Sequence, residues 1–295
     1  MATNNSRKTK AERVADSRAR ARQMQEQQRR KERRNRRLAI WGTIGAIVLV
    51  VALVIAFVLT RGSQDVPDQG QAASAANQQG GVTLTGPTEL GEPAEKLGDE
   101  VDASAVQVPE EPAQEQPESI PGAEEPADGE PAQIVVYGDF NCSHCYEFEQ
   151  SNADYLEGLL DEGKATVEYR MVGFLDNPGS GNYSSRAAAA SYCVADEAPE
   201  AYDRFVTDVF ATFAEKQGQG LSDEELVSTA SDAGADISSC VEDKTYRPMV
   251  KYTTAKAQEA GVRGTPTVFV NGKNWAVDGK DQSFQEFTDA QIEGK

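Results

Sequence analysis

The sequence predicts one α/β domain over residues 132–295, with the element order β-α-β, a block of helices, then β-β-α. Two observations carry this expectation. Short apolar runs bounded by turn residues are typical of buried strands, and apolar residues that recur every three or four positions between them are typical of helices. All four cysteines of the chain also lie inside this region.

The first part of the domain predicts a strand, a helix and a second strand. Ile134–Tyr137 is a short apolar run of the kind found in buried strands. Apolar side chains then recur at helical spacing until Gly163, namely Phe148, Tyr155, Leu156, Leu159 and Leu160. Thr166–Val172 alternates well enough to predict the second strand.

A helical insertion is expected over about 178–261. Ser184–Ala195 is rich in alanine, and an apolar helix face follows Pro199, a residue suited to the first turn of a helix. Ser222 and Glu225 have the spacing of a capping box, which predicts the start of another helix. One more helix completes the block.

The last part of the domain predicts a hairpin and a helix. Val268–Val270 and Trp275–Val277 flank Asn271-Gly272, a dipeptide that favours a type I′ turn. Phe284–Ile292 has an amphipathic pattern and predicts the final helix.

The N-terminal region has the opposite charge to the rest of the chain. Residues 1–37 hold 14 Lys and Arg against 4 Asp and Glu, so they carry +10, and the remainder sums to -29 of the net charge of -19. The basic run Arg29–Arg37 could bind a nucleic-acid backbone, but it adjoins an apolar segment. Retention of positive charge on the cytoplasmic side explains it more simply, and no nucleic-acid partner is expected.

The apolar segment Leu38–Leu59 contains no charged residue and predicts a transmembrane helix over residues 38–60. Its 22 residues would span about 33 Å as a helix, enough for a bilayer core. A cleaved signal peptide is the alternative, but apolar cores of signal peptides are shorter, at about 7–15 residues. We therefore expect a single-pass cell-membrane protein with a cytoplasmic N-terminus and an extracytoplasmic C-terminal domain.

Residues 61–131 form an acidic stretch rich in Pro, Gly, Ala and Gln and free of aromatic residues. Such a composition offers little apolar area to offset the entropy of ordering the chain. The stretch is therefore expected to be a disordered linker that tethers the domain to the membrane.

Cys142-Ser143-His144-Cys145 follows the first predicted strand and begins the first predicted helix. Unpaired backbone N–H groups and the helix dipole at such a position favour a thiolate. His144, the only histidine of the chain, would favour it further as an imidazolium. Cys142 is expected to be the attacking thiol and Cys145 the sheltered resolving thiol, with all three residues in the catalytic site.

Three less reactive interpretations of the motif stay open. The pair could be a structural disulfide, and His144 could be an uninvolved surface residue. A zinc site is also conceivable, but no second closely spaced cysteine pair supplies the remaining ligands. We expect no metal and no cofactor.

Gly264-Thr265-Pro266-Thr267 precedes the strand of the predicted hairpin. A proline that opens a strong strand is a candidate for a cis peptide bond, because proline cannot donate to the sheet ladder. Taken alone this signal is weak. It gains weight from the cysteine pair about 120 residues upstream.

Together these two motifs resemble the DsbA-like branch of the thioredoxin superfamily. The stretch Gly138–Cys145 is similar to its active-site segment, and Val262–Thr267 to its cis-proline loop. The resemblance implies a thioredoxin fold with a DsbA-like helical insertion, and a membrane-anchored thiol–disulfide oxidoreductase. It also implies that Thr265 and Pro266 present their backbone to a substrate peptide.

The sequence departs from the family pattern at two positions. Ser143 stands where many members have proline, which leaves the redox strength open. Val136 stands where thioredoxins and enteric-type DsbA carry an acid. Asp139 could replace that acid, although a plain turn residue is the favoured interpretation.

Cys193 and Cys240 both fall in the helical block. They could be two buried free thiols. In an exported domain a structural Cys193–Cys240 disulfide is favoured, because disulfides persist outside the cytoplasm and this pairing leaves the motif free to cycle.

The expected reaction is the introduction of disulfides into unfolded exported proteins. The resemblance implies a membrane partner of the DsbB or VKOR type that reoxidises the enzyme. A reductase or isomerase that uses the same residues is the alternative within enzymes. A binding or scaffold protein with a structural cysteine pair is the alternative of another class.

Overall fold

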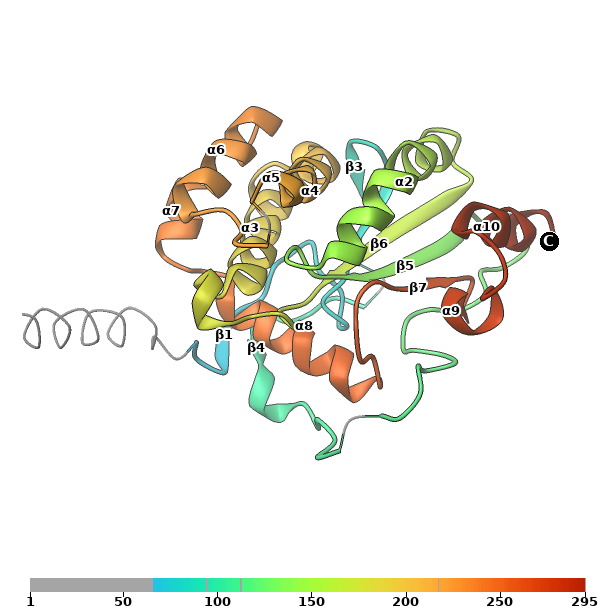
Figure 1. The fold of residues 1–295 in the computed structure, drawn as a ribbon, viewed down its shortest axis with the longest axis horizontal. Coiled ribbons are helices and arrows are strands. Elements are labelled where there is room, and N and C mark those ends of the chain that lie inside the picture. The colour runs from blue at the N-terminus through green and yellow to red at the C-terminus, as the bar shows by residue number, and fades with distance from the viewer. Residues whose placement is uncertain (1–65, 94, 112, 217, 295) are drawn as a thin grey trace, which may run out of the picture. The chain divides into compact units, whose positions relative to one another are not determined.

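A computed structural model describes residues 66–295, apart from positions 94, 112, 217 and 295 (Figure 1). The compact unit runs from Asp65 to Lys295. The predicted basic tail 1–37 and transmembrane helix 38–60 lie outside the described residues. In the part of the chain that is described, no helix has both the length and the apolar character needed to cross a membrane.

The core of the domain is a mixed sheet of six strands in the order β3-β2-β6-β5-β7-β8. Its strands are β2 (Val82–Gly86), β3 (Glu89–Leu90), β5 (Ala132–Gly138), β6 (Ala165–Met171), β7 (Thr267–Val270) and β8 (Lys273–Asn274). The central strands β5 and β6 pair in parallel, and β2 and β7 pair antiparallel to them on either side. A separate two-stranded ribbon joins β1 (Gln69–Gln71) to β4 (Glu100–Asp102).

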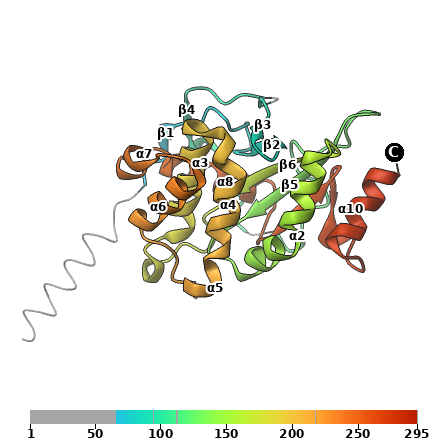
Figure 2. The same ribbon diagram turned by 90° about the horizontal axis from the view of Figure 1, so that it is seen from above.

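Helices cover both faces of the sheet (Figures 1 and 2). On one face lie α2 (Ser143–Asp161) and α10 (Phe284–Glu293), and α8 (Arg247–Glu259) lies on the other. The remaining helices are α3 (Tyr183–Glu197), α4 (Tyr202–Ala211), α5 (Phe213–Lys216), α6 (Asp223–Ala233), α7 (Ser238–Glu242) and α9 (Trp275–Asp278). Short 3₁₀ turns occur at Ala103–Ala105, Pro178–Ser180 and Pro199–Ala201. The helical insertion predicted over about 178–261 corresponds to α3–α8.

The alternation of side chains along β5 explains how one strand supports two apolar layers. Ile134 and Val136 join the core that packs under α2, whereas Val135 and Tyr137 join a second cluster under α8. Successive residues of a strand point to opposite faces, so a strand that is apolar throughout requires cover on both. This arrangement fixes the end of β5, and with it the start of α2.

The prediction of a disordered linker over 61–131 is wrong for the described residues from 66 onward. This segment, which we call the N-terminal strap, contributes β2 to the sheet, where Val82 and Leu84 are fully buried. Further along, Ile120 and Ala123 join the apolar cluster under α8. The prediction rested on the average composition of the segment, which does not reveal a few apolar residues at buried positions. The alternation in Val82-Thr83-Leu84-Thr85 was the local signal for a strand.

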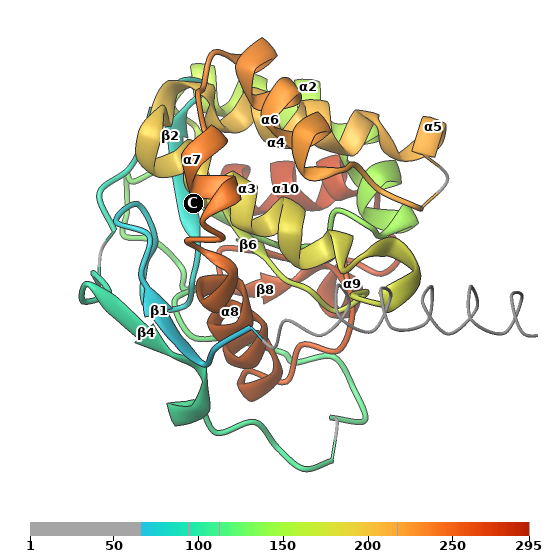
Figure 3. The ribbon, with the colours of Figure 1, turned by 90° about the vertical axis from the view of Figure 1, so that its left-hand side faces the viewer.

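Strands β1 and β4 of the strap lie beside α8 (Figure 3). Polar contacts hold further parts of the strap to the domain. The hydroxyl of Tyr252 on α8 donates to the carbonyl of Gln78 at 2.9 Å, and Asn274 donates to the carbonyl of Pro117 at 2.7 Å. The fully buried Arg170 donates to the carbonyl of Pro121 at 2.9 Å. These side chains satisfy strap carbonyls that lack a sheet partner, so a segment poor in apolar residues is still ordered.

The predicted C-terminal hairpin is shorter than expected. Asn271 and Gly272 adopt positive φ angles of 50° and 76°, as a type I′ turn requires. The second strand then ends at Asn274, whose side chain caps α9 by accepting from the N–H of Ala276 at 3.0 Å. Trp275 therefore begins a helix instead of continuing the strand, because a capping asparagine favours a helix start.

Candidate active site

Cys142 lies at the junction between β5 and α2, where the sequence predicted it. It is the residue before the first helical turn, and no side chain caps that end of α2. Its backbone N–H donates to the carbonyl of Asp139 at 3.0 Å, which closes the turn after the strand. The Cys142 side chain therefore faces the unpaired N–H groups of the first turn, an arrangement that stabilises an anion.

The two cysteines of the motif have opposite proton affinities. A hydrogen bond from Cys145, together with smaller contributions from Thr265 and from the backbone N–H groups of Cys145 and His144, lowers the pKa of Cys142 to about 5 against the effect of burial. Burial, and then the interaction with Cys142, raises the pKa of Cys145 well above its usual value. Cys142 is thus the thiolate at neutral pH and Cys145 the protonated partner.

The cis-proline loop lies against this pair. The Thr265-Pro266 peptide bond is cis, as predicted. In the thiol form, Sγ of Cys142 donates to the carbonyl oxygen of Thr265 at 3.2 Å. The structure thereby brings together two motifs that stand about 120 residues apart in the sequence.

His144 contacts the site through its backbone. Its ring is 75% exposed and Nδ1 lies 3.1 Å from a carboxylate oxygen of Glu147, one turn further along α2. The contribution of His144 to the lowered pKa of Cys142 comes from its backbone N–H. The predicted action of the imidazole on the thiolate therefore has less structural support than the action of the helix terminus.

Asp139 does form the turn, as the favoured interpretation held, but it is also completely buried. Its two carboxylate oxygens accept from the N–H groups of Asn141 at 2.8 Å and Leu175 at 2.9 Å. Burial raises its pKa to about 6, against smaller opposing effects of the nearby Ser184 hydroxyl and of the two N–H groups, and the charge of Cys142 adds to the rise. An acid therefore lies beside the cysteine pair even though Val136 is apolar.

Glu149 is a second buried acid that the sequence analysis missed. Burial raises its pKa to about 8, with a smaller opposing effect from the Tyr169 hydroxyl. Glu149 follows Cys145 by four residues and so lies on the same face of α2. The sequence already placed Cys145 on the sheltered face of this helix. The four-residue spacing therefore indicated that Glu149 would be buried on that face as well.

An apolar hollow adjoins the cis-proline. Its lining includes Pro266, His144 and three aromatic side chains, which are Phe148, Trp275 and Phe284. The ring of Phe284 lies edge-on to Phe148 at 5.0 Å and to Trp275 at 5.6 Å. Sequence periodicity assigned these aromatics to helix and strand faces, and only the packing of α2, α9 and α10 shows that they line a surface hollow.

The other two cysteines form a disulfide, as predicted. It joins Cys193 of α3 to Cys240 of α7, with 6.0 Å between the Cα atoms. Cys142 and Cys145 are the free cysteines. Across the described residues, no group of three or more His, Cys, Asp and Glu side chains could hold a metal ion.

The sheet flanked by helices, the cysteine pair at a helix start and the cis-proline loop together define a thioredoxin-type domain with a helical insertion. A family model described as Thioredoxin matches residues 127–290, more than half of the chain. The chain therefore belongs to this thioredoxin family. A second model, described as an inhibitor of host cell division protein domain, matches residues 16–76, most of which lie outside the described residues.

Three relatives refine this assignment. The structure of reduced DsbA from Mycobacterium tuberculosis matches with a TM-score of 0.50 and 30% identity, over 60% of this chain and 89% of that one. The probable disulfide bond formation protein D of Bacillus anthracis is 24% identical over 49% of this chain and 67% of its own length. The serine/threonine-protein kinase PknE of M. tuberculosis is 31% identical over 52% of this chain.

The chain spans only 29% of the length of PknE, so the similarity concerns one part of that kinase. The described domain is a DsbA-like thiol–disulfide oxidoreductase domain.

Proposed function

We propose that the protein is an oxidase that introduces disulfides into exported proteins. The observation that carries this proposal is the opposite shift of the two thiol pKa values, down to about 5 for Cys142 and well up for Cys145. A stabilised Cys142 thiolate favours the reduced form of the pair. A pair whose reduced form is stable is a strong oxidant of other thiols.

The reaction starts from a Cys142–Cys145 disulfide. A substrate thiolate attacks Sγ of Cys142, and the bond to Cys145 breaks. The Cys145 sulfur leaves with the electron pair and takes up a proton, as its raised pKa favours. A second substrate thiolate then attacks the substrate sulfur of the mixed disulfide and releases the Cys142 thiolate. The substrate loses two electrons, and the cysteine pair gains them.

The surface beside the pair fits an extended, partly apolar peptide. Thr265 and Pro266 border Cys142, and the aromatic hollow of Phe148, Trp275 and Phe284 continues from Pro266. An unfolded exported protein exposes apolar side chains next to its cysteines. We assign peptide positioning to the backbone of Thr265 and Pro266, and side-chain binding to the hollow.

The proposal includes the location of the enzyme. The basic residues 1–37 followed by the uncharged segment Leu38–Leu59 support a single-pass anchor with the domain outside the cytoplasmic membrane. There the Cys193–Cys240 disulfide is stable. Each cycle leaves the Cys142–Cys145 pair reduced, so an electron acceptor must remove the two electrons. By resemblance we assign this role to a membrane partner of the DsbB or VKOR type.

A reductase or isomerase with the same residues is the second candidate. The buried carboxylate of Asp139 favours it, because its negative charge acts against the Cys142 thiolate. A non-catalytic scaffold is a weaker candidate, since structural cysteines have no need of a lowered pKa.

The decisive experiment is the equilibrium of the purified full-length chain with reduced and oxidised glutathione, read by gel-shift alkylation of Cys142. We expect a potential less negative than the roughly -270 mV of thioredoxin, and stoichiometric oxidation of an unfolded dithiol substrate. A potential at or below that value would assign the reductase. Protease treatment of intact spheroplasts tests the location separately: the C-terminal domain should be degraded, and a tag at the N-terminus spared.

A further inference from the structure

The cis-proline loop occupies residues 260–266, between α8 and β7. Its residue Thr265 contacts Cys142 in both protonation states. The carbonyl oxygen of Thr265 accepts from the thiol at 3.2 Å. After the larger effect of Cys145, the side chain of Thr265 also helps to lower the pKa of Cys142. The reactivity of Cys142 therefore depends on where the loop holds Thr265.

Each end of this loop is fixed by the element that it joins. At the start, the N–H of Val262 donates to the carbonyl of Ala257 on α8 at 2.9 Å. At the other end, the buried Thr267 of β7 donates from its hydroxyl to the carbonyl of Gly264 at 2.8 Å. Contacts from another part of the chain then decide how firmly the middle of the loop is held.

The N-terminal strap supplies such contacts at two successive loop residues. Val262 is buried in the same apolar cluster as Ile120 of the strap. Arg263 donates from Nη1 to the carbonyl of Gln114, although Arg263 itself is an exposed residue. A guanidinium close to solvent is thus used to hold the strap backbone, and it lies two residues before Thr265.

Pro117 extends this contact to both sides of the surface beside Cys142. A Cβ on Gly261 would lie 3.8 Å from the Cβ of Pro117, so the strap packs on the start of the loop. The carbonyl of Pro117 accepts from Asn274 at 2.7 Å, directly before Trp275 of the aromatic hollow. In Figure 1 the strap accordingly runs from β4 past the end of α8 to α9 before it enters β5.

The core of the domain gives this part of the strap little reason to be ordered. Among the described residues of 109–119, none is buried. Burial of apolar area therefore contributes little to the order of the stretch. Its order rests on the contacts with the cis-proline loop and with α9, and the same contacts restrain the loop in return.

We propose that the N-terminal strap positions the cis-proline loop against Cys142, with Ile120 and Arg263 as the positioning residues. Loss of their contacts frees the middle of the loop, and Thr265 moves away from the thiol. The backbone of Thr265 and Pro266 then also loses its alignment with the aromatic hollow. The effect on peptides rests on the proposed binding surface, whereas the effect on Cys142 itself does not.

The test measures two properties of the full-length chain in zwitterionic detergent. The first is the midpoint of Cys142 alkylation against pH, with the Cys142–Cys145 pair reduced. The second is the rate constant for oxidation of a peptide dithiol relative to that for dithiothreitol, with the pair oxidised. Dithiothreitol is too small to need the peptide surface, so the ratio reports the position of the loop.

Ile120→Ala is the main variant, because it changes no charge. We expect it to raise the midpoint by roughly half a pH unit or more, since the contribution of Thr265 to the lowered pKa of Cys142 is weakened. Peptide oxidation should slow roughly tenfold, mainly through KM, because a displaced loop presents the peptide poorly. Oxidation of dithiothreitol should change far less. Ile120→Val makes a smaller change of the same kind in case Ile120→Ala fails to fold.

Arg263→Gln should shift both readouts in the same directions as Ile120→Ala. Arg263→Lys keeps the charge and a donor for the carbonyl of Gln114, so it should restore most of the wild-type behaviour. A shift in Arg263→Gln without any shift in Ile120→Ala would assign an effect of charge on the thiolate and overturn the positioning role.

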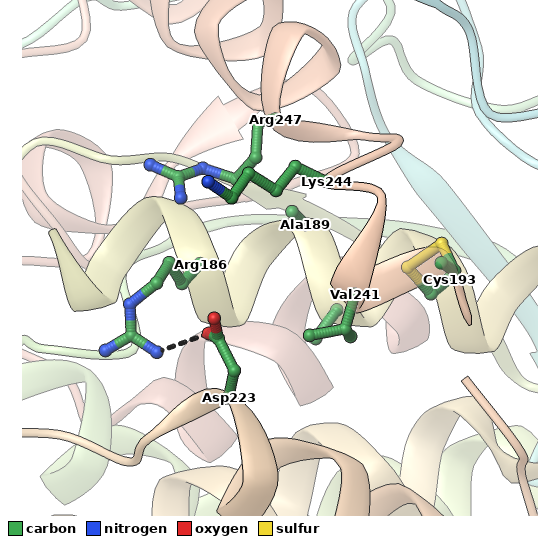
Figure 4. A pocket seen from close by; sticks show the side chains of 9 residues that line it. Arg186, Ala189, Cys193, Asp223, Val241, Lys244 and Arg247 are labelled. Atoms are coloured by element: carbon green, nitrogen blue, oxygen red, sulfur yellow. Dashed lines mark hydrogen bonds and ion pairs between the residues drawn. A yellow bond between two sulfur atoms is a disulfide. The ribbon is translucent and has the colours of Figure 1, made fainter. Parts of the chain in front are cut away.

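Arg186→Gln is the matched control for general destabilisation. Arg186 pairs with Asp223 at 2.8 Å in the helical insertion (Figure 4), and it also donates to the carbonyl of Leu221 at 2.8 Å. Its replacement should lower the melting temperature and leave both readouts unchanged. Equal shifts in this control would assign lost stability and overturn the inference. Unchanged readouts in folded Ile120→Ala and Arg263→Gln would overturn it as well.

The glutathione equilibrium reports the proposed function separately. A potential at or below that of thioredoxin would replace the oxidase by a reductase. Shifted alkylation midpoints in the strap variants would still assign the positioning role, because alkylation of Cys142 does not depend on the direction of electron flow.

Discussion

The chain holds two cysteine pairs whose surroundings differ in every respect that governs thiol chemistry. Cys142 and Cys145 lie three positions apart at the start of one helix, with their pKa values shifted in opposite directions. Cys193 and Cys240 lie 47 positions apart on two helices and are joined. The same functional group thus serves exchange where a helix terminus stabilises the thiolate, and cross-linking where two helices pack.

The largest effect on exchange activity should come from replacing one cysteine of the Cys142–Cys145 pair. Cys142→Ala should abolish oxidation of an unfolded dithiol substrate, because no attackable sulfur remains at the helix start. Cys145→Ala should accumulate mixed disulfides, because the resolving thiol is missing. Non-reducing gels and mass spectrometry of trapped adducts measure both.

The double variant Cys193→Ala/Cys240→Ala is the control and should keep exchange activity. Equal trapping by Cys142→Ala and Cys145→Ala would reject the assigned roles. Loss of exchange in a folded double variant would reject the structural role of the second pair.

The second pair should matter for stability instead. Its disulfide closes a loop of about 48 residues, which contributes roughly 4 kcal/mol in the chain-entropy model. For a domain of this size the double alanine variant should unfold about 10 °C lower. Differential scanning calorimetry measures this, with the Cys142–Cys145 pair kept reduced in both samples. A shift below a degree or two would mean that helix packing alone sets the stability of the insertion.

The two pairs should also differ in their response to pH, because Cys142 ionises whereas Cys193 and Cys240 are joined in a disulfide. The folded pKa of Cys142 is depressed to about 5, so ionisation stabilises the reduced fold at pH values above the unfolded pKa of about 8.5. This stabilisation is lost as the pH falls from there through about 5. The stability of the reduced form relative to the oxidised form should therefore decrease as the pH is lowered over that range. Alkylation of Cys142 should show its midpoint near pH 5, and a midpoint near 8.5 would contradict the active-site geometry.

The carboxylate of Asp139 should raise the pKa of Cys142. Its carboxylate titrates near pH 6 beside Cys142, and its charge opposes that of the thiolate. Asp139→Asn should therefore lower the midpoint of Cys142 alkylation and simplify its pH profile to a single step. Circular dichroism controls for the loss of its hydrogen bonds to Asn141 and Leu175. An unchanged profile in a folded variant would leave Asp139 as a turn residue only.

The smallest effect is expected at His144. Its ring is 75% exposed and close to Glu147, so replacement by alanine removes an exposed contact of small energetic weight while the backbone N–H stays in place. The potential should become more negative by less than about 30 mV, equivalent to about 1.4 kcal/mol. The glutathione equilibrium measures it, with Glu147→Gln as the companion variant. A larger drop would restore the imidazole as the main stabiliser of the thiolate.

The sequence by itself determined the local chemistry of this protein. Cys142 at a helix start, the proline that opens β7 and the capping box of Ser222 are encoded by neighbouring residues. Their consequences depend on short-range sterics and on hydrogen bonds within a turn or two. The pairing of Cys193 with Cys240 also followed, because it is the only one of the three pairings of four cysteines that leaves the motif free to cycle.

Only the tertiary structure decided which residues lie beside that chemistry. Asp139 and Glu149 became buried acids because helices and loops distant in sequence enclose them, and Trp275 became part of the hollow through α2 and α10. The ordered strap follows from the same cause. Its polar backbone is satisfied by Arg170, Tyr252 and Asn274, and a local composition average holds no information about such distant donors.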